Sequence, residues 1–340
     1  MKQEFYNISL RNRNSFHVEQ QAERLVEFTS EADLREIFAA GLPERWMVLS
    51  GGNNILFTQD YRGLLLTPVA DRIEILSEGG DRVRVRVEAG LEWDDLVAWA
   101  VEHELWGLEN LSLIPGKVGA APVQNIGAYG SEAKDCLLAV ECFLPGEGEG
   151  GVVRTFSREE CRFGYRESIF KQELKGRAII LAVTFALSRT AQPNIGYGDV
   201  AREVEARGGA TLKNIREAIC SIRRSKLPDT AVLGNAGSFF KNPVVDLRKS
   251  EELKSTYPEM PTYPSAEGPE RAKLAAGWLI DRAGLKGYRE GKVGVHDRQA
   301  LVLVNHGGAT GSEVISLARK VQKQVLEKFG VEIDTEVNIL

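Results

Sequence analysis

One serine in the sequence is placed where it could donate a proton. Ser238 lies in the run GNAGSFFKNP, where small residues surround a single hydroxyl and two aromatic rings follow it. A serine in such a turn is most often a turn former, because its hydroxyl bonds to the nearby backbone. A nucleophile is a poorer interpretation, since Phe240 occupies the position of the second glycine of G-x-S-x-G and no histidine lies in an activating motif. Proton donation depends mainly on position, so this role stays open.

Three charged residues are further candidates for chemistry. Arg166 lies in FGYRESIFK, Glu336 in the expected last strand and Lys226 in RRSKLPD. Any one of them could be an ordinary surface charge. Arg166 and Glu336, however, have apolar or aromatic neighbours, where an unpaired charge is costly. We therefore expect these two residues to pair with each other or with a ligand.

Two glycine-rich stretches could bind phosphate through the backbone. The first, VLSGGNNILF, has its turn at residues 50–54, between two expected strands. Glycine lets the chain approach a ligand closely and adopt positive φ, so the amide groups of this turn could close on a phosphate. The run does not fit G-x-G-x-x-G and no helix follows it, so a β-hairpin turn explains it as well.

The second stretch, PGKVGAAPVQNIGAYG, occupies residues 115–130 and has Lys117 as its one charged residue. We expect either backbone laid against a flat ligand or a buried crossover between domains. Two such stretches in one chain favour a dinucleotide cofactor. A third run, ALVLVNHGGATGSEVISLARK, has the strand, turn and helix order of a nicotinamide site. His306 stands at its first glycine position, however, and Thr310 or Ser312 would serve equally well as a helix cap.

Hydrophobic patterning predicts three parts along the chain. Residues 1–70 read as a small α/β unit, with a helix that begins at the capping box Ser30–Asp33. Strands dominate residues 71–210, where RVRVRV predicts a half-buried strand with its valines on one face. This part also contains an expected helix near residues 91–104 and a short helix capped by Ser157–Glu160. Residues 211–340 read as a third, α/β part that opens with a helix over 211–225.

Composition excludes several classes of protein. The formal charge of −5 over 340 residues leaves no broad basic surface for nucleic acid. No apolar run reaches the roughly 18 residues of a membrane span. The cysteines lack C-x-x-C spacing, which predicts buried, reduced thiols and no structural metal. We expect a cytoplasmic monomer.

Over nearly its whole length the chain resembles the UDP-N-acetylenolpyruvoylglucosamine reductase family, in the longer form with a tyrosine-bearing loop. The runs that carry the resemblance are LSGGNNILF, GLENLSLIPGKVGAAPVQNIGAYG, ECRFGYRESIFK, YGDV, RRSKLPD, GNAGSFFKNP, KLAAGWLID and the terminal TEVN. The resemblance implies an α+β fold. An FAD-binding fold of the vanillyl-alcohol oxidase (PCMH) type would occupy two subdomains, residues 1–70 and 71–210. A C-terminal α/β substrate-binding domain, residues 211–340, would return its last strand to the active site.

The resemblance also implies an enzyme, an FAD-dependent oxidoreductase with UDP-N-acetylmuramate dehydrogenase activity. In this family NADPH reduces the flavin, and the reduced flavin converts the enolpyruvyl ether of UDP-N-acetylglucosamine into the lactyl ether, a step of peptidoglycan precursor synthesis. The implied cofactors are FAD and NADPH, and the implied substrate is a UDP-sugar. Neither nucleic acid, membrane nor metal takes part.

Matched position by position, Ser238 resembles the family's proton donor, and Arg166 and Glu336 resemble the residues that stabilise the intermediate. Tyr197 is similar to the loop tyrosine that covers the substrate. The positions that match FAD contacts are Ser50, Gly51, Gly52, Asn53, Asn54, Pro115, Gly116, Gly119, Ala120, Gln124, Asn125, Gly127, Ala128, Tyr129 and Gly130. Those that resemble contacts to substrate or NADPH are Arg223, Lys226, Asn242, Tyr263 and Gln299.

Some positions depart from the family pattern, and two other functions stay open. Ser50 and Asn53 replace a glycine and a serine of the G-x-G-S-N turn, and Val337-Asn338 stands where some members carry an arginine. One alternative is a flavin oxidase of the same cofactor fold, which the family-like third part disfavours. The other is a nucleotide-sugar-binding protein without catalysis, which the joint presence of the three catalytic candidates disfavours.

Overall fold

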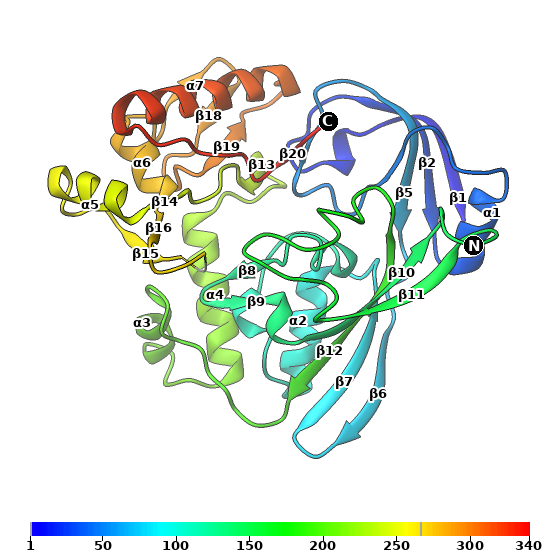
Figure 1. Ribbon diagram of the computed structural model, residues 1–340. Coiled ribbons are helices and arrows are strands. Elements are labelled where there is room, and N and C mark those ends of the chain that lie inside the picture. The colour runs from blue at the N-terminus through cyan, green and yellow to red at the C-terminus, as the bar shows by residue number, and fades with distance from the viewer. Residues whose placement is uncertain (1, 266) are drawn as a thin grey trace. The chain divides into compact units, whose positions relative to one another are not determined.

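The computed structural model describes residues 2–265 and 267–340 (Figure 1). The chain divides into two compact units. The first unit contains the chain up to Ile8, Ala22–Gly51 and Arg62–Ser225, and the second contains Ser9–Gln21, Gly52–Tyr61 and Lys226–Leu340. The division into three domains with boundaries near residues 70 and 210 therefore stays a proposal.

The first unit contains a four-stranded sheet with the order β1-β2-β5-β3. Its strands are β1 (Gln3–Ser9), β2 (Gln21–Phe28), β3 (Trp46–Val48) and β5 (Tyr61–Pro68). Helix α1 (Glu31–Phe38) begins where the sequence predicts, because the Ser30 side chain accepts a hydrogen bond of 3.2 Å from the amide of Asp33. Leu34 and Phe38 of α1 share a buried cluster with Val26 of β2, so the helix covers this sheet.

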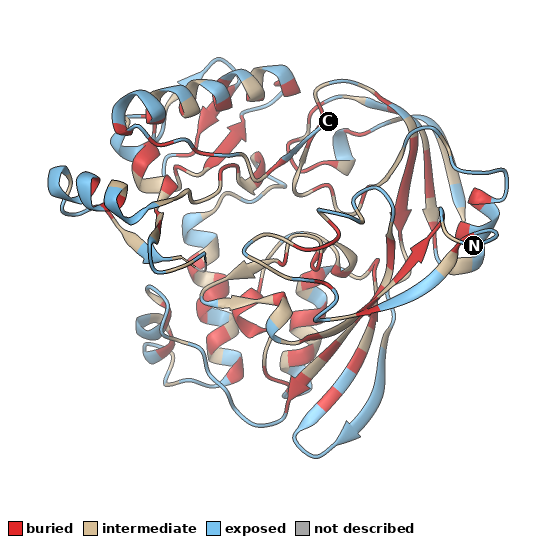
Figure 2. Ribbon diagram, in the orientation of Figure 1, coloured by how far each residue is buried: buried red, intermediate tan, exposed pale blue. Residues whose placement is uncertain are grey.

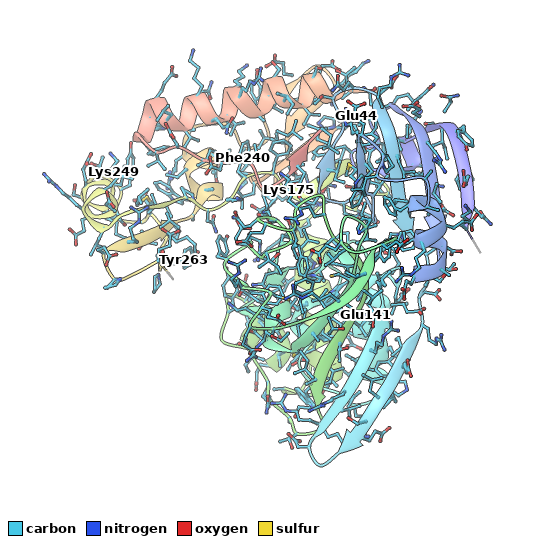
Figure 3. All side chains as sticks on the ribbon, turned by 45° about the vertical axis from the view of Figure 1, so that its right-hand side comes forward. Glu44, Glu141, Lys175, Phe240, Lys249 and Tyr263 are labelled. Atoms are coloured by element: carbon cyan, nitrogen blue, oxygen red, sulfur yellow. The ribbon has the colours of Figure 1, made fainter. Side chains whose placement is uncertain are left out.

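The second sheet of this unit has five antiparallel strands in the order β11-β10-β12-β7-β6. The strands are β6 (Ile73–Gly79), β7 (Arg82–Glu88), β10 (Leu137–Leu144), β11 (Val152–Ser157) and β12 (Ile179–Ser188). The predicted alternation along β7 is confirmed, since its valines are buried and its arginines are not (Figure 2). Those valines pack with Trp93 of α2 (Trp93–Glu102). Arg86 forms a 2.6 Å ion pair with Glu141, which Figure 3 labels.

Short elements and two helices complete the first unit. They are η2 (Glu109–Leu111), η3 (Val118–Ala120), β8 (Gly127–Ala128), β9 (Ser131–Glu132), η4 (Ala133–Asp135), α3 (Val200–Glu205) and α4 (Leu212–Lys226). Helices α3 and α4 bury their apolar faces in one cluster together with Trp106. Helix α4 confirms the helix predicted over 211–225, but its residues up to Ser225 group with the first unit rather than with the C-terminal part of the chain.

Two local interpretations of the sequence are wrong. Ser157 and Glu160 exchange the two hydrogen bonds of a capping box, yet they form a turn and no helix follows. The reason lies two residues further on, where Arg162 has φ = 46°, a left-handed conformation that a continuing helix does not allow. The GGNN run is not a β-hairpin turn either, because β3 pairs with β5, whereas β4 (Ile55–Leu56) pairs in parallel with β20 (Asn338–Ile339).

The second unit is built on a four-stranded antiparallel sheet, β13-β19-β18-β17, and a three-stranded one, β14-β16-β15. Their strands are β13 (Gly234–Ser238), β14 (Val244–Asp246), β15 (Thr262–Pro264), β16 (Arg271–Leu274), β17 (Arg289–Glu290), β18 (Val293–Val295) and β19 (Val302–Asn305). The helical elements are η1 (Arg11–Arg13), α5 (Leu247–Thr256), α6 (Ala276–Arg282) and α7 (Gly311–Phe329). Helix α7 packs on β18 and β19. The rings of Tyr257, Trp278 and Phe329 lie 5.4–5.9 Å apart and join α6 and α7 to the end of α5.

The run ALVLVNHGGATGSEVISLARK is a capped helix start and not a nicotinamide site. Strand β19 lies between two antiparallel neighbours, whereas a nicotinamide-binding βαβ unit needs a parallel pair. Thr310 caps α7 in a capping box: its hydroxyl accepts a hydrogen bond from the backbone amide of Glu313, and the carboxylate of Glu313 accepts one from the backbone amide of Thr310.

The cysteines are free, as the sequence predicts. Cys142, Cys161 and Cys220 are buried and Cys136 is half-buried. Burial raises the pKa of Cys136 and of Cys161 to about 12, so both are protonated thiols near neutral pH. Within the described parts of the chain, no helix combines the length and the apolar character that crossing a bilayer requires.

We expect Gly311→Ala to destabilise the second unit. A Cβ atom on this first residue of α7 would lie 2.0 Å from the carbonyl oxygen of Phe57. Because that oxygen belongs to the backbone, the helix start must shift, at a cost of about 1–3 kcal/mol. Urea unfolding measures this cost, with Gly79→Ala as the control, since the space around Gly79 is open to 4 Å. Equal midpoints for the two variants would contradict the close approach.

Candidate functional site

The turn that carries Ser238 is shaped by a glycine bulge. Ser238 is the last residue of β13, and the pairing of β13 with β19 shifts register between Asn235 and Ser238. Gly237 has φ = 68° and donates its amide to Asn235 Oδ1 at 2.9 Å. Glycine suits this left-handed position because it has no Cβ atom. The bulge thus sets the direction in which the chain presents the serine.

Aromatic packing fixes the same turn from the other side. Phe239 and Phe240 are fully buried, and their rings meet edge to face with centroids 5.2 Å apart (Phe240 is labelled in Figure 3). Phe16 packs against Phe239 in the same manner at 6.0 Å. The half-buried Ser238 therefore stands beside a rigid hydrophobic anchor.

The C-terminal segment brings Glu336 next to the serine turn. The amide of Glu336 donates to the carbonyl of Phe239 at 2.8 Å, and the amide of Lys241 donates to the carbonyl of Asp334 at 2.9 Å. Asn54 Nδ2 in turn donates to the carbonyl of Glu336 at 3.3 Å. Ser238 and Glu336, almost a hundred residues apart in the sequence, thus lie on adjacent hydrogen-bonded segments of the second unit.

Arg166 lies in the first unit, and its guanidinium is held by the second glycine-rich stretch. It donates to the carbonyl of Gly127 at 2.6 Å and to that of Asn125 at 3.4 Å. The backbone of Arg166 is left-handed, with φ = 55°. Such a conformation is uncommon for a residue with a side chain and marks a constrained position. The pairing of Arg166 with Glu336 stays a prediction, because the two residues belong to different units.

The turn at residues 50–54 retains unused polar groups. Among the described residues, the amides of Gly51, Gly52 and Asn53 donate no hydrogen bond, and the buried hydroxyl of Ser50 has no partner. Gly52 has φ = 65°, and a Cβ atom there would lie 2.1 Å from the carbonyl oxygen of Arg13. Packing alone therefore requires this glycine, but the free amides and the hydroxyl fit the phosphates of a dinucleotide.

The second stretch is an ordered loop with several left-handed residues. Gly116, Asn125, Tyr129 and Gly130 have φ of 116°, 45°, 49° and 80°. Tyr129 and Gly130 form the two-residue turn of the β8–β9 hairpin, in which both positions need positive φ. Asn125 is fully buried and ties the loop to its surroundings, because its amide group donates to Glu132 and to the carbonyl of Gly164, both at 3.0 Å.

Two of the substrate candidates, Tyr197 and Arg223, lie near Tyr129 in the first unit. The ring of Tyr197, which is half-exposed, stands perpendicular to that of Tyr129 with centroids 6.1 Å apart. Arg223 of α4 donates its Nε to the carbonyl of Leu113 at 3.2 Å, and its positive charge interacts with the phenol of Tyr129. Burial lowers the pKa of Arg223 and raises that of Tyr129, and the contact between the two groups opposes both shifts.

The other substrate candidates lie at the end of α4 and in the second unit. Lys226 is the last residue of α4. Asn242 accepts the first amide of α6 at 3.0 Å, so part of its side chain has a structural role. Tyr263, which Figure 3 labels, is 39% exposed, and Lys273 Nζ lies 6.0 Å from the centre of its ring. Gln299 is half-buried, and its backbone amide donates a hydrogen bond to His296 Nδ1. These placements leave the ligand contacts of the four residues as predictions.

An ion pair that the sequence does not reveal fixes the backbone just before the second glycine-rich stretch. Asp94 of α2 accepts two hydrogen bonds from Arg216 of α4, at 2.7 and 2.9 Å, and one of 2.6 Å from the amide of Leu113. Leu113, with φ = 56°, stands two residues before Pro115. No sequence signal connects Asp94 with Arg216, because they are 122 residues apart and each resembles an ordinary helix-surface charge.

Comparisons with known proteins identify the family of the chain. Residues 228–340 match the family model described as "UDP-N-acetylenolpyruvoylglucosamine reductase, C-terminal domain", and residues 22–154 match the one described as "FAD binding domain". A UDP-N-acetylenolpyruvoylglucosamine reductase of Chromobacterium violaceum is 51% identical, with 98% of both chains covered, and one of Pseudomonas aeruginosa is 49% identical, with 97% of both covered.

A solved structure supports the same fold. The crystal structure of UDP-N-acetylenolpyruvylglucosamine reductase (MurB) from Thermus caldophilus is 24% identical, has a TM-score of 0.68, and covers 100% of this chain and 98% of its own. Together with the family models, it confirms the α+β fold expected from the sequence, with an FAD-binding part and a separate C-terminal domain.

We expect the Asp94–Arg216 pair to stabilise the fold only above acidic pH. Burial alone would raise the pKa of Asp94, but Arg216 and the amide of Leu113 lower it below the ordinary 3.8. Because the folded-state pKa is the lower one, the pair's contribution is full above about pH 5 and is lost as pH falls through the folded-state value. Urea unfolding of the parent protein and Asp94→Asn at several pH values tests this. The stability difference should be constant near neutrality and shrink below pH 3.8; a difference independent of pH would refute it.

Proposed function

Since the chain belongs to the UDP-N-acetylenolpyruvoylglucosamine reductase family, we propose that it uses NADPH to reduce the enolpyruvyl ether of UDP-N-acetylglucosamine to UDP-N-acetylmuramate. The chain is an FAD-dependent oxidoreductase. The product is a precursor of peptidoglycan, so the proposed place of the reaction is the bacterial cytoplasm. The proposed form of the enzyme is a monomer.

One observation carries the proposal most directly. Ser238 follows a left-handed glycine at the end of β13, and the backbone of Glu336 is hydrogen-bonded to the residue that follows this serine. Two residues with the chemistry of an acid and a carboxyl partner are thus held side by side by backbone bonds. A surface turn has no need of this arrangement.

The cofactor would be held largely by backbone groups. The unused amides of Gly51, Gly52 and Asn53 would bind its pyrophosphate, and the loop from Pro115 to Gly130 would lie along the rest of the molecule. Bound FAD supplies the means of moving a hydride from NADPH to the terminal vinyl carbon of the substrate.

Arg166 is the proposed stabiliser of the negative charge that develops on the substrate. Hydride addition to the vinyl carbon places extra charge beside the carboxylate, as an enolate. A guanidinium can meet a carboxylate through two parallel hydrogen bonds, and these strengthen as the charge grows. The bonds from Arg166 to the carbonyls of Asn125 and Gly127 would hold it ready, so that little reorganisation is needed during the reaction.

Ser238 is the proposed proton donor to the adjacent carbon. The enolate is a far stronger base than water, so a hydroxyl suffices if it is held over the correct face. Glu336 would assist by sharing a proton with the enolate oxygens. Arg223 and Lys226 offer positive charge to the diphosphate of a UDP-sugar, and Tyr197, Asn242, Tyr263 and Gln299 stay proposed as further contacts.

The anaerobic visible spectrum of the purified protein tests the proposed reaction. Flavin absorbance should bleach when NADPH is added and return when the enolpyruvyl UDP-sugar follows. A protein that stays colourless after FAD is supplied would leave only nucleotide-sugar binding. Bleaching that oxygen reverses but the sugar does not would favour an oxidase.

We expect Ser238→Ala to separate the two half-reactions. Reduction of the flavin by NADPH should stay nearly unchanged, while reoxidation by the UDP-sugar should slow by about a hundredfold or more, the usual contribution of a general acid. Stopped-flow absorbance measures both rates. Ser255→Ala is the matched control, because Ser255 is an exposed residue of α5 whose hydroxyl bonds its own helix. Equal damage to both half-reactions would reject the role of Ser238.

A further inference from the structure

We propose that Asn110 and Asn194 couple the segment that carries Tyr197, residues 190–199, to the flavin-binding stretch, so that flavin binding orders this segment. The coupling rests on the proposed function only in assuming that FAD occupies the stretch and that Tyr197 faces the substrate. Both asparagines are positioning residues, since neither is proposed to contact the reacting groups.

Asn110 bridges the two segments from inside the protein. It is 1% exposed, and its Nδ2 donates to the carbonyl of Tyr129 at 2.8 Å and to the carbonyl of Asn194 at 2.7 Å. Both partners are acceptors, so the orientation of the side-chain amide is fixed by the bonds it makes. The reversed orientation would place Oδ1 against two carbonyl oxygens.

The bridge is retained at a cost in free energy. Asn110 Oδ1 is buried and has no donor within the described parts of the chain. A buried acceptor without a partner is destabilising, and an apolar side chain of similar size would avoid this cost. The NH₂ group of Asn110 is therefore the part of the residue that this position requires, because it alone joins Tyr129 to Asn194.

Asn194 completes the link from the other side. Its Nδ2 donates to the carbonyl of Gly130 at 3.0 Å and to the hydroxyl of Ser131 at 3.1 Å. The main chain of Asn194 is thus bound through Asn110, and its side chain is bound directly, to the same two-residue turn of the β8–β9 hairpin, whose strands Figure 1 labels. Two independent connections fix one residue of the segment to consecutive positions of the stretch.

The link reaches Tyr197 over a short distance along the chain. Tyr197 is three residues beyond Asn194, and its ring stands against that of Tyr129. Ile195 and Tyr129 both pack on the buried cluster of α3 and α4. The rest of the segment is mostly exposed. The bonds of Asn194 therefore tie the middle of the segment to the turn Tyr129–Gly130, and a ligand that orders this turn also restricts Tyr197.

Amide hydrogen exchange of the whole protein, with and without FAD, tests the coupling. In the parent protein, FAD should slow exchange of the amides of residues 195–199. In Asn194→Ala this protection should fall by about tenfold, because two hydrogen bonds to the β8–β9 hairpin are lost. Gln192→Ala is the matched control, since Gln192 is an exposed amide on the same segment that makes no side-chain hydrogen bond with the described residues.

A second variant addresses the buried half of the bridge. Asn110→Asp keeps the shape of the side chain, but it replaces the NH₂ group that donates to the carbonyls of Tyr129 and Asn194 with an oxygen that can only accept. It should remove the protection entirely, whereas Asn194→Ala keeps the Asn110 bridge. If Asn110→Asp does not fold, Asn194→Ala against Gln192→Ala still decides the outcome.

Kinetic constants give a second measurement, which would not change if the two asparagines only stabilised the fold. In Asn194→Ala the KM for the UDP-sugar should rise about tenfold, while the rate of flavin reduction by NADPH stays unchanged. Equal protection by FAD in the parent protein and in Asn194→Ala would overturn the coupling, as would the absence of protection in the parent protein. A protein that binds no FAD would overturn both the coupling and the proposed function. Protection by FAD without turnover of the UDP-sugar would overturn the proposed function alone.

Discussion

The backbone carbonyls of the stretch Pro115–Gly130 are held by side chains that lie 19 to 64 residues away in the sequence. Arg166 binds the carbonyls of Asn125 and Gly127, and Asn110 and Asn194 bind those of Tyr129 and Gly130. The stretch has few polar side chains of its own and contains left-handed residues, each of which costs about 1 kcal/mol or more outside glycine. External hydrogen bonds compensate these costs. The shape of the proposed flavin-binding surface therefore depends on them.

The residues that hold the stretch are also connected to candidates for substrate binding. Arg223 touches both Leu113 at its entry and Tyr129 near its end, and Tyr197 stands against Tyr129. Asp94 and Arg216 anchor α2 and α4 to the same entry. The proposed cofactor and substrate groups of the first unit thus share one set of polar contacts, through which the proposed coupling would act.

The second unit holds Ser238, the proposed weak acid, in a fixed position. A serine hydroxyl needs a fixed direction more than an altered acidity. Gly237 supplies the bulge, the buried rings of Phe239 and Phe240 supply rigidity, and the last segment of the chain brings Glu336 alongside. Backbone bonds and apolar packing do this work, so the site needs no buried charge pair to hold the serine in place.

The sequence by itself determined the periodic elements and the family. Alternating valines set the buried face of β7, Ser30 and Thr310 set two helix starts, and long motif runs identified the fold and the cofactor. These features are local, since each depends on residues within a few positions. Tertiary structure alone decided that GGNN is no hairpin, that Asp94 meets Arg216 and that Asn110 joins two loops. Those contacts join positions tens to hundreds of residues apart, and no local pattern in the sequence encodes which distant partner a polar side chain will meet.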